Sequence, residues 1–140
     1  MTFWDSSALV AMITGEPKAQ ALLPLLSSDP RITLWWSAEV EATSAICRAR
    51  RIGVVDEEAA PHLLRKMADL IAGANEVEPT EEVRATACRL LRVHELRAAD
   101  ALQLAAAVIW AGRHPANFGF VCLDRRLRTA AAREGFDVLP

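Results

Sequence analysis

Two aspartates each follow a short segment that favours a strand conformation, and their carboxylates are candidates for a shared site. Asp5 comes directly after Thr2 to Trp4, and Asp124 comes directly after Gly119 to Leu123. If these strands are parallel neighbours, their carboxyl ends meet at one sheet edge, where open α/β sheets bind ligands. Taken alone, Asp5 has a simpler interpretation, because aspartate is a frequent N-cap of helices. The argument for a site therefore depends on further acids at the same edge.

Further acids lie on two predicted helices. Asp100 stands in the opening turn of Ala98 to Ala111, a segment that is apolar on nearly every side. It either complements the helix dipole or is held by a positive group such as Arg97, because an unpaired buried carboxylate is costly. Glu39 and Glu41 both lie at the margin of an apolar helix face, and helical geometry does not choose between them. Either glutamate is also an ordinary solvent-facing helix residue.

Three or four carboxylates at one sheet edge repel one another, and a bound cation relieves this repulsion. An all-oxygen cluster suits Mg²⁺ or Mn²⁺ and does not suit zinc. Such an ion deprotonates a water and orients a phosphate, and two ions ~4 Å apart hold both the attacking and the leaving oxygen. The predicted chemistry is hydrolysis of a phosphodiester. The three histidines lack the spacing of metal ligands and are expected at the surface or half-buried: His62, His94 and His114.

Alternating strands and helices position these acids. Because parallel strands need crossover connections, this alternation predicts an α/β fold with a parallel sheet covered on both faces. Ser6 or Ser7 is expected to cap the first helix, and Ser37 the third. The predicted strands are residues 2–4, 31–36, 76–78, 119–123 and 136–139, and the predicted helices are residues 8–13, 17–28, 38–52, 56–74, 80–94, 98–111 and 125–134.

Composition narrows the class of protein. The 140 residues, 52% hydrophobic and 24% charged, predict one folded domain, and a net charge of −2 confines any nucleic-acid contact to local basic patches. The longest apolar run, Leu104 to Ala111, is too short to cross a bilayer, and no signal peptide is recognisable. Three distant cysteines predict neither disulfides nor a zinc site and are expected as reduced, buried thiols. We therefore expect a cytoplasmic protein without a membrane anchor.

Four segments together resemble the PIN-domain ribonucleases, and within them the VapC toxins of bacterial type II toxin–antitoxin (VapBC) pairs. They occur in the family's order and extend over the whole chain. The matching segments are Asp5-Ser6-Ser7-Ala8-Leu9, Trp36-Ser37-Ala38-Glu39-Val40-Glu41, Ala99-Asp100-Ala101-Leu102-Gln103-Leu104-Ala105 and Phe120-Val121-Cys122-Leu123-Asp124-Arg125-Arg126-Leu127.

The resemblance implies one PIN domain over residues 1–140. The implied fold is a three-layer α/β/α arrangement with a five-stranded parallel sheet in the order 3-2-1-4-5. By the same resemblance, Asp5, Asp100 and Asp124 take the positions of the metal-binding aspartates. Glu41 takes the position of the family's glutamate, because it precedes a run of small and apolar residues, and Glu39 is the alternative.

The resemblance also suggests residues around the acids. Ser7 matches the hydroxyl residue that orients the first aspartate. Cys122 is a departure, since many relatives have Thr or Ser two residues before the last acid, and a contact of that hydroxyl with water or phosphate would be missing. Arginines near the acid-bearing segments would form a basic rim for RNA, although surface acids explain any single one equally well: Arg48, Arg50, Arg51, Arg97, Arg125, Arg126 and Arg128.

The function implied by the resemblance is that of a Mg²⁺-dependent endoribonuclease toxin, with Mn²⁺ as a possible substitute, inhibited by a cognate VapB-type antitoxin. An RNA-processing PIN nuclease without an antitoxin and an inactive PIN-fold binding module are the alternatives. Relatives commonly form homodimers, and apolar helices with Trp35, Trp36 and Trp110 offer such a surface, although core burial explains each tryptophan equally well.

Overall fold

The computed structural model describes residues 1–140 as a parallel sheet between two layers of helices. The strands are β1 (Thr2–Trp4), β2 (Ile32–Trp35), β3 (Asn75–Val77), β4 (Gly119–Val121) and β5 (Asp137–Leu139). The helices are α1 (Ser6–Thr14), the 3-10 helix η1 (Pro17–Ala21), α2 (Leu23–Ser28), α3 (Ala38–Arg51), α4 (Ala60–Ala72), α5 (Glu81–Val93), α6 (Ala98–Trp110) and α7 (Arg125–Glu134).

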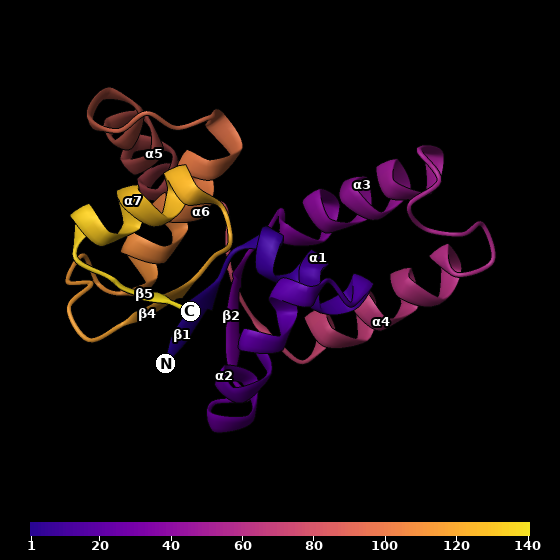
Figure 1. Ribbon diagram of the computed structural model, residues 1–140. Helices are drawn as coiled ribbons and strands as arrows, with labels where there is room; N and C mark the ends of the chain where they lie inside the picture. The colour runs from indigo at the N-terminus through magenta and orange to yellow at the C-terminus, as the bar shows by residue number, and fades with distance from the viewer.

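The sheet has the order β3-β2-β1-β4-β5, and every neighbouring pair is parallel. The predicted three-layer α/β/α fold and the strand order are therefore confirmed. Figure 1 shows α5, α6 and α7 on one side of the sheet and α1, α3 and α4 on the other, with α3 and α4 as a long antiparallel pair. Strand β1 lies in the centre, so that its carboxyl end is flanked by the ends of β2 and β4.

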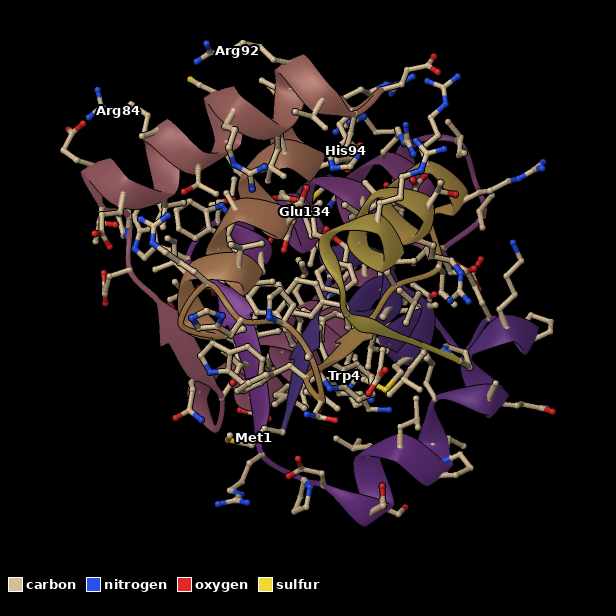
Figure 2. The ribbon with its side chains drawn as sticks, turned by 90° about the vertical axis from the view of Figure 1, so that its left-hand side faces the viewer. Met1, Trp4, Arg84, Arg92, His94 and Glu134 are labelled. Atoms are coloured by element: carbon tan, nitrogen blue, oxygen red, sulfur yellow. The ribbon has the colours of Figure 1, made fainter.

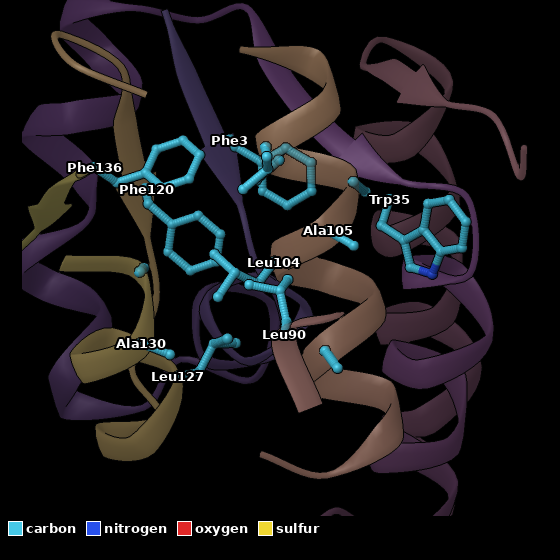
Figure 3. Close-up of a cluster of buried hydrophobic side chains, with 14 of the residues drawn as sticks. Phe3, Trp35, Leu90, Leu104, Ala105, Phe120, Leu127, Ala130 and Phe136 are labelled. Carbon is cyan, nitrogen blue, oxygen red and sulfur yellow. The ribbon is translucent and has the colours of Figure 1, made fainter. Parts of the chain in front are cut away.

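Alternation along the strands divides the apolar side chains between two cores. On β1, Phe3 faces the α5–α7 side and Trp4 faces the α1–α4 side, and both are fully buried. On the α5–α7 side, Phe120 stacks on Phe3 with ring centroids 5.6 Å apart and contacts Phe136 at 5.5 Å (Figure 3). This register fixes which residue at the end of each strand reaches the sheet edge.

Two helices differ from the sequence prediction, and a proline explains both differences. The single helix predicted over 17–28 is divided into η1 and α2, because Pro24 has no amide hydrogen and would clash with a continuous helix before it. Helix α4 begins at Ala60, four residues later than the Asp56 start predicted. Pro61 fits the first turn of a helix but not its interior.

Cysteines and histidines also depart in part from expectation. All three cysteines are free, as predicted, but only Cys122 is buried, whereas Cys88 is exposed on the outer side of α5. His94 is buried and not at the surface, because it pairs with Glu134, a residue 40 positions away that sequence spacing does not reveal. No helix is both long enough and apolar enough to cross a lipid bilayer.

The packing predicts unequal costs for two leucine truncations. Leu104 is fully buried on α6 (Figure 3), whereas Leu91 on α5 is 41% exposed. We expect Leu104→Ala to lower the free energy of unfolding by about 2 to 5 kcal/mol, and Leu91→Ala by less than about 1 kcal/mol. Urea unfolding followed by circular dichroism measures both. Equal losses would contradict the assigned core.

Candidate active site

The carboxyl ends of β1 and β4 bring the first and last aspartates to one edge of the sheet. The amide of Asp5 donates to the carbonyl oxygen of Val121 at 2.9 Å, which ties the end of β1 to the end of β4. Strand β4 ends at Val121, two residues earlier than predicted, and Asp124 is the N-cap of α7. A pocket of about 380 Å³ opens here, lined by Asp5, Ser6, Ser7, Val10, Glu16, Lys18, Glu41, Ala45, Asp100, Leu123 and Asp124.

Asp5 is the most deeply buried acid of the pocket, with only 3% of its surface exposed. Its Oδ2 accepts hydrogen bonds from the amide of Ser7, at 3.0 Å, and from the Ser7 hydroxyl. Asp5 is thus the N-cap of α1, and the prediction that Ser6 or Ser7 caps this helix is wrong. The hydroxyl of Ser7 also accepts from the amide of Leu123, so Ser7 joins the first aspartate to the segment that leads to the last.

Glu41 reaches the pocket from α3 and is held by neutral donors. The hydroxyl of Ser6 donates to Oε2 at 2.9 Å and that of Ser37 to Oε1 at 2.6 Å, while the side-chain amide of Gln103 donates to Oε2 at 3.1 Å. Ser37 makes no capping hydrogen bond, because its hydroxyl serves Glu41. Glu39 is exposed and does not line the pocket, so geometry distinguishes the two glutamates where the sequence did not.

Asp100 and Asp124 are the other two predicted acids that line the pocket. Asp100, in the first turn of α6, is half-buried. Burial raises the pKa of Asp100, the charges of Asp124 and Glu41 raise it further, and Arg97 opposes them in part. Asp124 is exposed, and its Oδ1 accepts from the amide of Leu127 at 2.9 Å. Burial is thus the main cause of the raised pKa of Asp100, and the charges of its acidic neighbours add to it.

Cys122 lies between the first and last aspartates. Its thiol donates to Oδ2 of Asp5 at 3.6 Å, and its sulfur accepts from the amide of Asp124 at 3.3 Å. Burial first, and then the charge of Asp5, raise the pKa of the Cys122 thiol far above its ordinary value. The thiol therefore remains neutral and acts as a weak hydrogen-bonding link at the position where the resemblance implies Thr or Ser.

The donors around the pocket match a hard divalent cation in kind. Five side chains supply carboxylate oxygens, namely the four predicted acids and Glu16, and no histidine lines the pocket. Burial raises the pKa of Asp5 to about 6, against the favourable hydrogen bonds of Ser7, and the charges of Glu41 and Asp100 add to the rise. No three His, Cys, Asp or Glu side chains of the chain lie close enough to bind one ion together as they stand. The pocket thus presents suitable oxygen donors and not a formed coordination sphere.

Three of the predicted arginines lie beside the carboxylates. Arg97, Arg125 and Arg126 line a hollow of about 530 Å³ that also includes Ala99 and the same Asp100 and Asp124. Arg48 lines a different hollow, around Ile52 to Val55, which shares Val10, Glu16 and Ala45 with the carboxylate pocket. Arg128 is occupied by backbone carbonyls, including that of Cys122 at 2.8 Å.

Three residues at the pocket were not predicted from the sequence. Glu16 and Lys18 line it, the latter from η1. Gln103 is fully buried and donates to Glu41, while its carbonyl oxygen has no hydrogen-bond partner in the chain. The sequence could have identified Gln103 by its position. It is the only polar residue besides Asp100 in the apolar helix, and it lies three residues after Asp100 on the same face.

The fold and this acidic sheet edge define a class of protein. A family model described as PIN domain matches residues 2–133, and the chain belongs to this family. Its sequence is 31% identical over 142 residues to Ribonuclease VapC45 of Mycobacterium tuberculosis, an alignment that covers 100% of this chain and 95% of the relative. The predicted PIN resemblance is thereby confirmed.

Solved structures share the fold at low identity. VapBC2 from Rickettsia felis, bound to a DNA fragment from its promoter, superposes with a TM-score of 0.67 at 10% identity, covering 99% of this chain and 98% of that one. A toxin–antitoxin complex from Klebsiella pneumoniae gives a TM-score of 0.63 at 14% identity, covering 89% and 87%.

The raised pKa of Asp5 predicts how pH affects the metal-free protein. The folded chain holds a proton at Asp5 up to about pH 6, whereas the unfolded chain releases it near 3.8. This contribution to stability is complete below about pH 4 and is lost as the pH rises through about 6. The Asp5→Asn substitution removes the titrating carboxyl group, so this loss of stability with rising pH is abolished. Asparagine is also a favourable N-cap residue.

We therefore expect the stability of Asp5→Asn relative to wild type to rise by on the order of 2 kcal/mol between about pH 4 and about pH 8. Urea unfolding in a chelating buffer measures the difference at each pH, so that groups common to both proteins cancel. A difference independent of pH would contradict the burial of a charged Asp5.

Proposed function

We propose that residues 1–140 act as one PIN domain that hydrolyses RNA phosphodiester bonds with a divalent cation, as the toxin of a toxin–antitoxin pair. The observation that carries this proposal is the convergence of Asp5, Glu41, Asp100 and Asp124 on one pocket. The similarity to a relative named Ribonuclease VapC45 supports RNA as the substrate.

Asp5, Asp100, Asp124 and Glu41 would hold the cation, with Mg²⁺ or Mn²⁺ best suited to their oxygens. The ion would activate a water and neutralise charge on the phosphate. Ser7 orients Asp5 through its amide and hydroxyl, and Ser6, Ser37 and Gln103 orient Glu41. These neutral donors fix the carboxylates without adding positive charge that would compete with the cation.

Arg97 and Arg125 would position the substrate. Both line the hollow that shares Asp100 and Asp124 with the carboxylate pocket. A guanidinium makes paired hydrogen bonds to phosphate oxygens, and it keeps its charge at every physiological pH. An RNA backbone lying across this hollow would therefore meet arginine beside the point of cleavage.

An antitoxin would act by covering this pocket. Proteins with the same fold occur in toxin–antitoxin complexes, which supports a cognate VapB-type partner for this chain. A homodimer also belongs to the proposal. Trp35 is buried and is not available for an interface, whereas Trp36 is 52% exposed and Val40 is 67% exposed.

Cleavage assays with isosteric variants test the nuclease. We expect Asp100→Asn and Glu41→Gln to reduce RNA cleavage with Mg²⁺ or Mn²⁺ by at least about 100-fold, because each removes a charged metal ligand. Both variants should remain folded by circular dichroism.

Glu39→Gln is the matched control, since Glu39 lies two residues from Glu41 on the same helix and is exposed. It should cleave at the wild-type rate. Cleavage that survives Asp5→Ala or Asp100→Asn unchanged would remove the proposed site. Absence of both cleavage and divalent-ion binding in the wild type would favour the inactive binding module.

Inhibition by a partner tests the toxin role separately. We expect the product of a small neighbouring gene to co-purify with this chain and to suppress RNA cleavage at about one equivalent, because a tightly bound segment over the pocket excludes the substrate. Gel filtration and cleavage of the same RNA measure both effects. A nuclease that no such partner binds or inhibits would instead be an RNA-processing enzyme.

A further inference from the structure

A second pocket lies along α7, beyond the carboxylates. It has a volume of about 340 Å³ and is lined by His94, Glu95, Arg125, Arg126, Thr129, Ala130 and Arg133. Helix α7 forms one wall, since Arg126, Thr129 and Arg133 recur at helical spacing on one face. The segment after α5 forms the other wall, and Figure 2 shows His94 beside Glu134 where α5 and α7 meet.

This pocket adjoins a third hollow, which in turn adjoins the carboxylate pocket. The hollow of Arg97 and Arg125 shares Asp100 and Asp124 with the carboxylate pocket, and it shares Arg125 and Arg126 with the pocket along α7. The three hollows therefore lie in a row, called the track below, that begins at the acids and follows α7. An elongated ligand that lies along the track from the acids would reach Arg133.

The pocket has an excess of positive charge. Arg125, Arg126 and Arg133 are all exposed and line it. Glu95 is the one acid in the lining, and its carboxylate lies 3.8 Å from Arg126, with the two side chains 88% and 65% exposed. An ion pair this exposed contributes little to stability, and an anion that binds arginine more strongly readily displaces the glutamate.

The nearby acid Glu134 does not cancel this charge. Its carboxylate accepts from Arg89 at 2.8 Å and is 2.7 Å from Nε2 of His94. Burial raises the pKa of Glu134, but the hydrogen bonds of Arg89 and His94 outweigh it, and the pKa lies below its ordinary value. Glu134 is thus a satisfied anion behind the pocket. The ring of His94 is held in place, with Nδ1 buried and without a hydrogen-bond partner.

We propose that the pocket of His94, Arg126, Thr129 and Arg133 binds a backbone phosphate of the RNA substrate, away from the bond to be cleaved. This inference rests on the proposed nuclease function. Thr129 and Arg133 lie about 8 and about 14 Å beyond Asp124 at 1.5 Å per helical residue. At about 3.4 Å per stacked nucleotide, the bound phosphate is about two to four nucleotides from the cleavage point. The RNA backbone carries a phosphate at every nucleotide, and this repeated charge suits a track with arginines at successive positions.

RNA binding in the absence of cleavage is the direct test. Both arms use the Asp100→Asn background and a labelled single-stranded RNA of about 12 nucleotides, followed by fluorescence anisotropy. We expect Arg126→Gln with Arg133→Gln to weaken binding about tenfold, because two charge-assisted contacts are lost. The slope of log affinity against log salt should shrink by about 0.7, because one phosphate contact on a single strand is lost.

Two further variants complete the test. One is a control, and the other should change RNA affinity in the opposite direction. Arg92→Gln removes an exposed arginine on the outer side of α5 (Figure 2), outside the track, and should leave binding within about twofold of the parent. Glu95→Gln removes the only acid of the pocket and should tighten binding by about twofold. Equal effects of the Arg92 and the Arg126 with Arg133 substitutions would overturn the proposal.

Cleavage of long and short RNA then locates the contact. In the protein with Asp100 intact, Arg133→Gln alone should lower kcat/KM about threefold for the 12-nucleotide RNA and leave that of a dinucleotide unchanged, because a dinucleotide is too short to reach Arg133. Equal losses on both substrates would place Arg133 at the cleavage point and overturn the proposal.

The two proposals fail in different ways. If the wild type cleaves no RNA, the nuclease function fails, while anisotropy still reports whether Arg126 and Arg133 bind RNA. If cleavage is normal and the double variant weakens only the complex with an acidic protein partner, the pocket is a protein-docking site and the RNA proposal is overturned. Thermal unfolding of each variant excludes misfolding, and the exposure of both arginines favours a retained fold.

Discussion

Repulsion between carboxylates is the constraint on which this site depends. Asp5, Glu41, Asp100 and Asp124 come from four separate segments, and their burial and mutual charge raise the pKa of Asp5 and Asp100. Each anchored carboxylate is fixed by a neutral donor, namely the Ser7 amide, the Gln103 amide or the Leu127 amide. These donors hold the carboxylates in place. Because they carry no charge, they supply no positive charge to balance the carboxylates.

The two cores make this unfavourable arrangement possible. Phe3 and Phe120 face one core, and Trp4 and Val121 face the other, so the register of β1 against β4 is fixed on both faces. A slip of β1 by one residue would exchange Phe3 and Trp4 between the cores, which is far more costly than the repulsion at the sheet edge. Apolar packing thus determines where Asp5 lies.

Most strands and helices could be predicted from local sequence patterns, because runs of strand-forming residues and the periodicity of apolar residues in helices directly reflect which side chains are buried. The aspartates were predictable for a related reason, since topology alone places residues after parallel strands at one edge. The choice of Glu41 over Glu39 and the role of Gln103 depend on contacts between distant segments, such as the 62-residue separation of Gln103 and Glu41. No local pattern encodes such a contact. Pro24, in contrast, was a local signal whose effect on the second helix was missed.

The first turn of α7 breaks a local rule in an informative way. Asp124 caps the helix, yet Arg125 and Arg126 follow at once, where the helix dipole disfavours positive charge, and no acid stands in that turn. Neither arginine stabilises the helix from this position. Both line the hollow beside the acids and the pocket along α7. Sequences that violate local preferences without a structural gain commonly do so at functional sites. The change from acid to base within one helical turn places the acid proposed to bind a cation beside the arginines proposed to bind phosphate, as the proposed cleavage of a polyanion requires.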